Sequence, residues 1–268
     1  MKVSVGQFNP GGDVAENLAA MRKLAVLAQQ DGGRLILFPE ESMFSVGRVA
    51  GNFADAVERQ WTTFVQGVSL LAADVGIAVI AGGYESSGED RPYNTVVAVD
   101  EDGAILGTYR KLHLYDAFSY QESQRIKPGD NGVTLVEIGG FKVGIMTCYD
   151  IRFPELARAL TLAGADLIAV AAAWFKGDHK VEHWETLLKA RAIENTVWIA
   201  AAGTSSDHCI GHSAIIDPMG IPQDFLADEA QGVATVDVTH RRIEEVREFL
   251  PVLLNRRFEQ SSVVVAAR

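Results

Sequence analysis

Short apolar runs alternate along this chain with longer segments of helical periodicity. Residues 3–8 and 34–40 are apolar runs of strand length, and residues 13–30 between them place apolar side chains at helical spacing. A strand, a helix and a second strand in this order are the unit from which parallel and mixed α/β sheets are built. The alternation therefore predicts an α/β fold.

The same order of elements occurs twice. In the first half, a helix over residues 54–75 precedes three strands, IAVIAGGYE, YNTVVAVD and GAILGTYR. The second half contains strand 141–147, helix 154–163, strand DLIAVAAA, helix 179–194 and strand VWIAAAG. The hairpin segments NTVVAVDEDGAILG and HSAIIDPMGIPQD share an apolar run, an acidic turn and a glycine, which indicates either internal duplication or common hairpin chemistry. We expect two mixed sheets, each with helices on one face, packed as a four-layer αββα sandwich.

Length and composition favour one folded unit. The 268 residues are 48% hydrophobic and 22% charged, which is ordinary for a globular α/β protein of this size. We therefore predict a single domain over residues 1–268, with a C-terminal tail from about residue 251 that reaches over a neighbouring subunit.

Charge and hydropathy argue against nucleic-acid and membrane partners. The net charge is −11 and the basic residues are scattered, so the sequence has no basic patch of the kind that binds nucleic acid or anionic lipid. Its apolar runs are shorter than the 18 residues of a membrane span, and the first residues do not resemble a secretory signal. The sequence predicts a cytoplasmic protein.

Three reactive side chains follow predicted strands directly. Glu40, with Glu41 beside it, ends the run LILFPE, Lys111 follows LGTYR, and Cys148 follows GIMT. Ligands of α/β sheets collect at the carboxyl ends of strands, so we expect these side chains at one site. The chain has only two cysteines, too few for a disulfide framework and without metal-ligand spacing.

The three residue types together suit nucleophilic catalysis. A thiol needs a base to take its proton, and a carboxylate can act as that base if burial raises its pKa or if the proton moves within a preset hydrogen bond. A nearby ammonium lowers the thiol pKa and stabilises an oxyanion. Each residue alone has a simpler reading, because a lone cysteine is commonly a small buried hydrophobe, a glutamate after proline a cap, and a lysine a solvated charge.

Long ordered motifs resemble the nitrilase superfamily of carbon-nitrogen hydrolases. They cover nearly the whole chain and are VGQFNP, FPEE, YRKLHLYD, YQES, KPGD, GIMTCYDIRFPELAR, HWETLLKARAIENT and GHSAIIDPMG. The resemblance implies the αββα sandwich, catalysis by Glu40, Lys111 and Cys148, and a further glutamate, Glu122, that orients the lysine and the leaving group. It also implies an oxyanion donor in the Tyr149 backbone N–H, no cofactor and no metal, and a homodimer or higher homo-oligomer joined through the helical layer.

The motifs around Cys148 also suggest a substrate. CYDIRFPEL and HW..L..ARAIEN resemble the omega-amidase and deaminated glutathione amidase branch, which implies a small linear amide that bears a carboxylate. The alternatives are an N-carbamoyl amino acid hydrolase or a nitrilase with the same triad and, from another class, a catalytically silent scaffold.

Other residues near these motifs have two readings each. Arg152 either pairs with Asp150 or Glu155 to brace the turn or grips a substrate carboxylate. Trp174 and Phe175 follow another strand end and form either a pocket wall or ordinary core.

Three further side chains have readings outside the triad. His113 is expected to orient the loop of Lys111. Cys209 is expected to be an incidental thiol, with a place in the pocket lining as the alternative. His179 and His183 in HKVEH match an inverted zinc-peptidase pattern, but the expected helix offers no third ligand, so we expect no zinc there.

Overall fold

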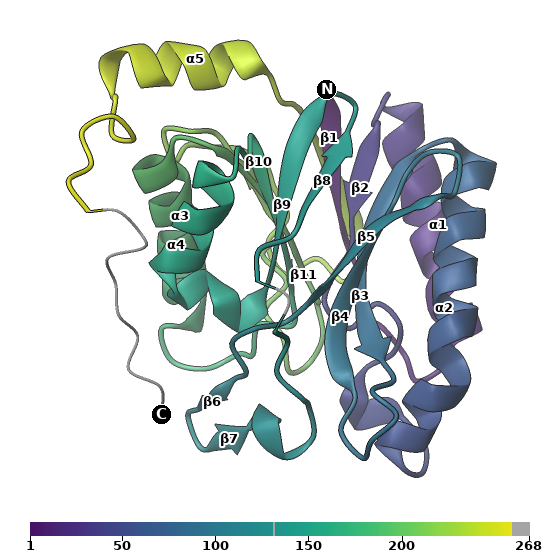
Figure 1. Cartoon of the computed structure of the whole chain (residues 1–268). Helices are drawn as coiled ribbons and strands as arrows, with labels where there is room; N and C mark the ends of the chain where they lie inside the picture. Colours follow the sequence, from purple (N-terminus) through teal and green to yellow (C-terminus); the bar gives the residue numbers. More distant parts are fainter. Residues whose placement is uncertain (131, 259–268) are drawn as a thin grey trace.

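A computed structural model describes residues 1–130 and 132–258, and these fold into two six-stranded mixed sheets packed face to face between helices (Figure 1). The first sheet has the order β14 (Gly232–Asp237), β1 (Lys2–Gln7), β2 (Leu35–Leu37), β3 (Ala78–Glu85), β4 (Tyr93–Val99) and β5 (Ile105–Arg110). The second has the order β13 (Pro222–Phe225), β12 (Ala214–Ile216), β11 (Trp198–Gly203), β10 (Leu167–Ala172), β9 (Phe141–Thr147) and β8 (Leu135–Ile138). The predicted αββα sandwich is confirmed.

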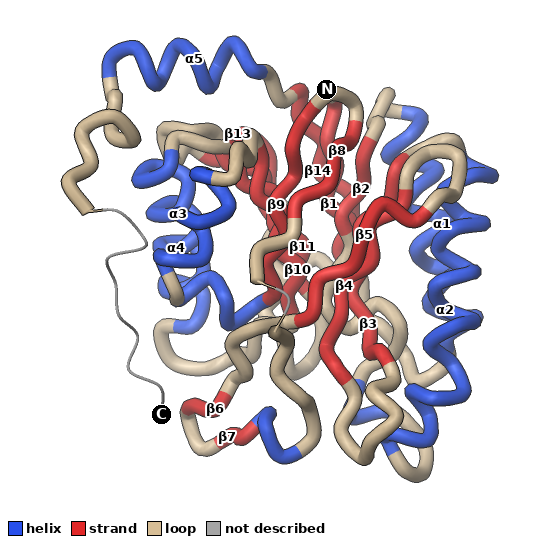
Figure 2. Tube along the Cα trace, viewed as in Figure 1, coloured by secondary structure: helices blue, strands red, loops and turns tan. Residues whose placement is uncertain are grey.

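Helices form the two outer layers. The first sheet is covered by α1 (Val14–Gln30) and α2 (Phe53–Val75), and the second by α3 (Pro154–Leu162) and α4 (Lys180–Asn195), while α5 (His240–Phe249) crosses one end of the sandwich (Figures 1 and 2). Asp13 and Asn52, which precede α1 and α2, each accept a hydrogen bond from a backbone N–H of the first turn, at 3.0 and 3.1 Å. These caps explain why the predicted helix starts lie within one residue of the observed ones.

The two sheets share one connectivity. In the first, β1, β2 and β3 are parallel, and β4 and β5 continue as antiparallel strands. In the second, β9, β10 and β11 are parallel, and β12 and β13 continue in the same way. The two similar hairpin segments are therefore β4–β5 and β12–β13, at equivalent positions, as internal duplication would place them.

Alternation along the strands creates the core between the sheets. Leu35 and Leu37 of β2 point inward and join Val143 and Ile145 of β9 in one buried cluster. Ile36 faces the other way and packs under α1 and α2 in a second cluster. The sheets are thus fixed face to face, which brings the carboxyl ends of β2 and β9 to the same end of the sandwich.

The structure differs from the sequence expectation in three strands. β2 ends at Leu37 rather than near residue 40, because Pro39 has no N–H for a ladder and its carbonyl instead accepts from the Gly82 N–H and the Ser42 hydroxyl. The edge strands β8 and β14 were not predicted. β14 pairs with β1, more than 200 residues away, so no local pattern could have signalled the pairing.

The remaining elements are two short hairpin strands and three 3-10 turns. The hairpin strands β6 (Asp116–Ala117) and β7 (Tyr120–Gln121) lie at the lower end of the sandwich in Figure 2. Three 3-10 turns are present, η1 (Val46–Arg48), η2 (Glu122–Gln124) and η3 (Cys148–Arg152).

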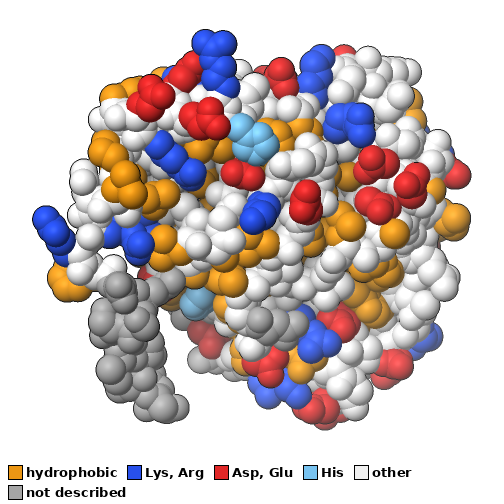
Figure 3. All heavy atoms as spheres, turned by 45° about the horizontal axis from the view of Figure 1, so that its top comes forward, with side chains coloured by type: hydrophobic (Ala, Val, Ile, Leu, Met, Phe, Trp, Pro, Cys, Tyr) orange, Lys and Arg blue, Asp and Glu red, His pale blue; other side chains and the backbone are white. Residues whose placement is uncertain are grey.

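Among the described residues, no helix is both long and apolar enough to cross a membrane. Acidic and basic side chains are interspersed on the face seen in Figure 3.

Candidate active site

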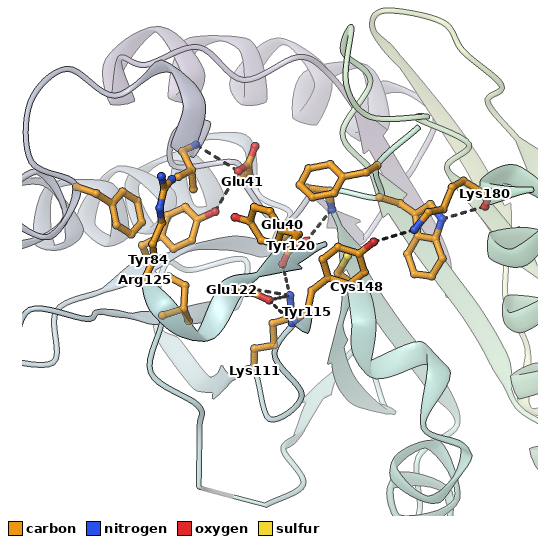
Figure 4. A pocket seen from close by; sticks show the side chains of 16 residues that line it. Glu40, Glu41, Tyr84, Lys111, Tyr115, Tyr120, Glu122, Arg125, Cys148 and Lys180 are labelled. Atoms are coloured by element: carbon orange, nitrogen blue, oxygen red, sulfur yellow. Dashed lines mark hydrogen bonds and ion pairs between the residues drawn. The ribbon is translucent and has the colours of Figure 1, made fainter. Parts of the chain in front are cut away.

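The structure brings Glu40, Lys111 and Cys148 into one pocket at the carboxyl ends of the strands. Glu40 follows β2, Lys111 comes directly after β5, and Cys148 comes directly after β9. All three line one pocket (Figure 4). The empty space in the pocket is about 620 Å³ when its mouth, which is open to solvent, is included. The strand-end positions predicted that these three side chains lie close together, and the structure places them in one pocket.

Lys111 lies buried between two carboxylates. Its side chain is 2% exposed, and its Nζ donates to Glu40 Oε1 at 2.8 Å and to Glu122 Oε2 at 2.9 Å. Glu122, in η2, is held in turn by the Tyr115 backbone N–H, which donates to its Oε2 at 2.6 Å. Each carboxylate has several donors, so the buried charges are paired as buried charges must be.

Glu40 accepts hydrogen bonds on both of its oxygens. Asn94 Nδ2 donates to Oε1 at 2.7 Å, on the side of Lys111, and also reaches Glu122 Oε1 at 3.3 Å. The Ala173 backbone N–H, just beyond β10, donates to Oε2 at 2.7 Å. Sequence reasoning missed both donors: Asn94 reads as an ordinary strand residue, and a backbone N–H leaves no trace in the sequence.

A buried aspartate couples the turn of Cys148 to the loop of Lys111. Asp150 Oδ2 accepts from the Thr147 N–H at 2.9 Å and from the Tyr109 hydroxyl at 2.7 Å. Its Oδ1 accepts from the His113 N–H at 3.1 Å and lies 2.7 Å from His113 Nδ1. The expected role of His113, orienting the loop that carries Lys111, is consistent with this contact and stays a prediction.

The backbone at Cys148 is strained. Its φ is 46°, in the left-handed region that non-glycine residues rarely adopt. The strain is held in place by Asp150 and by Arg191 of α4, whose Nε donates to the Ile151 carbonyl at 2.9 Å. The thiol is thereby fixed at the mouth of the sheet, 7% exposed.

The protonation states follow from burial and pairing. Burial alone would raise the pKa of Glu40, but the charge and hydrogen bond of Lys111 and the hydrogen bonds from the Ala173 N–H and Asn94 together outweigh it, so the net shift is downward. Burial raises the pKa of the Cys148 thiol well above its usual value, and the charge of Glu40 adds to this while Lys111 opposes it. Lys111 does lower the thiol pKa, as expected, but burial and the charge of Glu40 outweigh its effect, so the net shift is upward. The resting site holds a neutral thiol beside an ionised carboxylate and an ammonium.

Aromatic side chains form the walls of the pocket. Trp174 and Phe175 line it, as do Tyr84, Tyr115 and Tyr120. Trp174 is also 4% exposed and packs against Trp184, so this side chain belongs both to the pocket wall and to the hydrophobic core. The part of Trp174 and Phe175 in binding a substrate stays a prediction.

Arg152 lies beside the pocket lining, and its two readings, a brace of the turn through Glu155 or an anchor for a substrate carboxylate, stay predictions. It does not pair with Asp150, whose oxygens bind Tyr109 and His113, and it does not line the pocket. Its guanidinium lies behind the wall, 4.8 Å from the ring centroid of Trp174, and one nitrogen is 3.4 Å from His183 Nδ1. A different cation, Lys180, lines the pocket, and sequence reasoning missed it.

Two further cationic or acidic groups border the pocket. Glu41 accepts from the Tyr84 hydroxyl at 3.2 Å and from the Val46 N–H, and burial raises the pKa of Glu41. Arg125 lies exposed at the rim near Tyr84 (Figure 4).

The remaining sequence candidates lie outside the pocket lining. Cys209 is 3% exposed and pairs with Phe175 in an isolated bridge, and burial raises the pKa of its thiol to about 12. His179 contacts Glu182 and His183 contacts Arg152. Within residues 1–130 and 132–258, no group of three His, Cys, Asp or Glu side chains is arranged to hold a metal ion.

Comparisons with known proteins agree on one family. The family model described as carbon-nitrogen hydrolase matches residues 2–248. A deaminated glutathione amidase of Escherichia coli O157:H7 is 48% identical over 168 residues, which are 63% of this chain and 63% of that protein. An omega-amidase of Xenopus tropicalis is 31% identical over 272 residues, 98% of this chain and 97% of that protein.

A solved structure extends the similarity to the fold. A variant of the amidase from Nesterenkonia sp. AN1, with the acetamide moiety of fluoroacetamide added covalently at its active-site cysteine, matches with a TM-score of 0.81. The identity is 26%, and the match covers 96% of this chain and 94% of the other.

Proposed function

The chain belongs to the carbon-nitrogen hydrolase family and resembles the omega-amidase and deaminated glutathione amidase branch of the nitrilase superfamily, and on that premise we propose the residues and the route by which it hydrolyses an amide. The proposed substrate is a small linear amide that carries a carboxylate. The proposed route passes through a thioester on Cys148. The observation that carries it is the buried Lys111 between Glu40 and Glu122, with the thiol facing Glu40.

The first step is attack on the amide carbonyl. Glu40 is ionised and its charge helps to raise the pKa of the neutral Cys148 thiol, so in this route Glu40 takes the proton as Cys148 Sγ bonds to the carbonyl carbon. This is the second route that the sequence left open, proton movement within a preset hydrogen bond. No free thiolate needs to exist before substrate arrives.

The oxyanion that forms needs donors already in place. Lys111 Nζ donates to Glu40 Oε1 at 2.8 Å and to both oxygens of Glu122, at 3.1 and 2.9 Å. We propose that the two Glu122 contacts share one N–H, so that the third N–H of the ammonium points at the oxyanion. The Tyr149 backbone N–H, one residue beyond the nucleophile, is the second proposed donor.

Collapse of the tetrahedral intermediate releases ammonia. The C–N bond breaks as Glu40 returns the proton to the departing nitrogen, and the acyl group remains on Cys148 as a thioester. Water then attacks the thioester carbonyl while Glu40 takes one of its protons, and the C–S bond breaks as that proton passes to sulfur. Glu122 keeps Lys111 in position throughout and orients the leaving group.

The test is ammonia release from a panel of amides, N-carbamoyl compounds and nitriles. We expect linear amides to release ammonia and Cys148→Ala to abolish the release, while Cys209→Ala, the matched change at the other buried thiol, leaves it unchanged. Full turnover by Cys148→Ala would refute the nucleophile. Release of carbon dioxide together with ammonia would indicate hydrolysis of N-carbamoyl compounds, and consumption of a nitrile but not of amides would indicate a nitrilase. No reaction with any compound of the panel would indicate a catalytically silent scaffold.

We also propose a cytoplasmic homodimer or larger homo-oligomer joined through the helical layer. Light scattering of the purified chain measures the mass directly, and a monomer at micromolar concentration would refute the assembly. The proposed tail contact lies partly in residues 259–268, outside the described residues.

A further inference from the structure

A buried lysine without a carboxylate lies across the pocket from the triad. Lys180 is the first residue of α4 and is 7% exposed. Its Nζ donates to the Tyr115 hydroxyl at 2.9 Å, and no carboxylate of the described residues forms an ion pair with it. A buried ammonium with one neutral acceptor is costly, since buried charges are normally paired.

Aromatic rings supply most of its remaining surroundings. Nζ lies 3.7 Å from the ring centroid of Phe118, 5.1 Å from that of Tyr115 and 5.8 Å from that of Trp174. Ring faces attract a cation but carry no formal charge, so they compensate its lost hydration only in part. The described surroundings of Lys180 therefore leave its positive charge without a formal counter-charge.

A second cation adds to that charge. The Arg152 guanidinium packs on the same Trp174 ring, and burial together with the charge of Arg152 lowers the pKa of Lys180. Two cations thus repel each other across one aromatic wall. An anion that enters the pocket would relieve this repulsion, which is the opposite of the situation at Lys111.

Tyr115 sets Lys180 at a fixed place relative to the reaction centre. Its backbone N–H binds Glu122, and its hydroxyl binds Lys180 (Figure 4). Lys180 and Cys148 line the same pocket, and a negative charge on the sulfur would be felt at Nζ. One substrate can therefore contact both ends at once.

We infer that Lys180 is the residue that anchors the substrate's carboxylate, at the end of the substrate away from the amide that reacts. Arg152 adds its positive charge from the other side of the contact with the Trp174 ring. This inference rests on the proposed amidase function and assigns the substrate specificity of that same pocket to a residue.

The kinetic test uses two amides that differ only in charge. Succinamate carries a carboxylate, and succinamide carries a neutral group of the same shape in its place. We expect Lys180→Met to raise KM for succinamate about 30-fold with kcat within about threefold, because a charged contact is lost from ground state and transition state alike. Initial rates on succinamide should stay within about threefold of the wild type.

Two matched variants separate charge recognition from structure. Lys180→Arg keeps a cation and should retain a preference for succinamate, while Lys176→Met, which removes an exposed lysine of the loop that precedes α4, should change nothing. Equal losses on both amides in Lys180→Met would make Lys180 a merely structural residue and overturn the inference.

A binding measurement keeps the inference independent of turnover. Calorimetry on Cys148→Ala should show succinamate bound at least about tenfold more tightly than succinamide, and Lys180→Met added to that variant should remove the difference. Equal affinities would overturn the inference. If the wild-type protein hydrolyses both amides without preference, Lys180 is not a carboxylate anchor, although the proposed amidase activity stands. If succinamate binds selectively but no ammonia is released, the anchor stands and the proposed amidase activity is refuted.

Discussion

The two ends of the pocket differ in the partners of their buried lysines. At the catalytic end, Lys111 lies between Glu40 and Glu122, and Asn94 and two backbone N–H groups donate further hydrogen bonds to these carboxylates. At the cationic end, Lys180 contacts a phenol and aromatic rings, and no carboxylate in residues 1–130 and 132–258 forms an ion pair with it. One buried lysine thus has carboxylate partners and the other has only neutral ones among these residues.

This difference separates chemistry from recognition. Changes at the catalytic end should slow every amide alike, because the groups there act on the reacting atoms. Changes at the cationic end should affect only substrates that bring a negative charge. The predictions below test the catalytic end, from the largest expected effect to the smallest.

Glu40→Gln should cause the largest loss. The amide cannot accept the thiol proton, so kcat should fall by about 10³-fold for charged and neutral amides alike. The neighbouring Glu41→Gln is the matched control, because Glu41 binds Tyr84 and not Lys111, and its loss should stay under about tenfold. Comparable losses from the two variants would show that Glu40 is not the base.

Lys111→Met should weaken both catalysis and folding. Two buried carboxylates would lose their cation, so we expect a fall in kcat/KM of about 10²-fold and a loss of about 3 kcal/mol in the free energy of unfolding. Denaturant titration and ammonia release measure the two effects. Lys127→Met removes an exposed ion pair with Glu89 and is the control; it should alter neither quantity. Unchanged stability of Lys111→Met would contradict the buried ion-pair arrangement.

Asp150→Asn should have an intermediate effect. One acceptor oxygen that binds Thr147, Tyr109 or His113 becomes a donor, so we expect a loss of about 2 kcal/mol in stability and about a tenfold loss in kcat. The exposed Asp178→Asn serves as control. An active, fully stable Asp150→Asn would show that the turn holds the thiol without this link.

The pH profile of the wild type should show the smallest effect. The pKa of Glu40 is lowered below 4.5 and that of the thiol is raised above 9.0, so kcat/KM should vary less than about threefold between about pH 6 and pH 9. Stability should follow the same window: the contribution of Glu40 is lost as pH falls through its depressed pKa, and that of Lys111 as pH rises through its raised pKa. A rise in kcat/KM centred near pH 8.5 would indicate a preformed thiolate instead.

The sequence predicted the parts of this molecule that have a local pattern. Alternating strand and helix periods gave both sheets and four of the helices, and three reactive residues directly after apolar strands gave the triad positions. The strand β14 was missed because its partner β1 lies at the other end of the chain.

The rest of the pocket depends on contacts that no local pattern contains. Lys180 reads as a surface residue in HKVEH, and its burial is set by Phe118 and Trp174, which come from separate segments. The contact of Arg152 with the Trp174 ring has the same origin. The direction of the thiol pKa shift depends on a balance between burial, Glu40 and Lys111, and only coordinates give that balance.

The central claim is that the carbonyl of the substrate becomes bonded to Cys148. Acid quench of the wild-type protein during turnover of succinamate, followed by peptide mass spectrometry, tests it most directly. The account predicts a succinyl group on the peptide that contains Cys148 and none on the peptide that contains Cys209. Sustained ammonia release with both peptides unmodified, or with the acyl group on another residue, would contradict it.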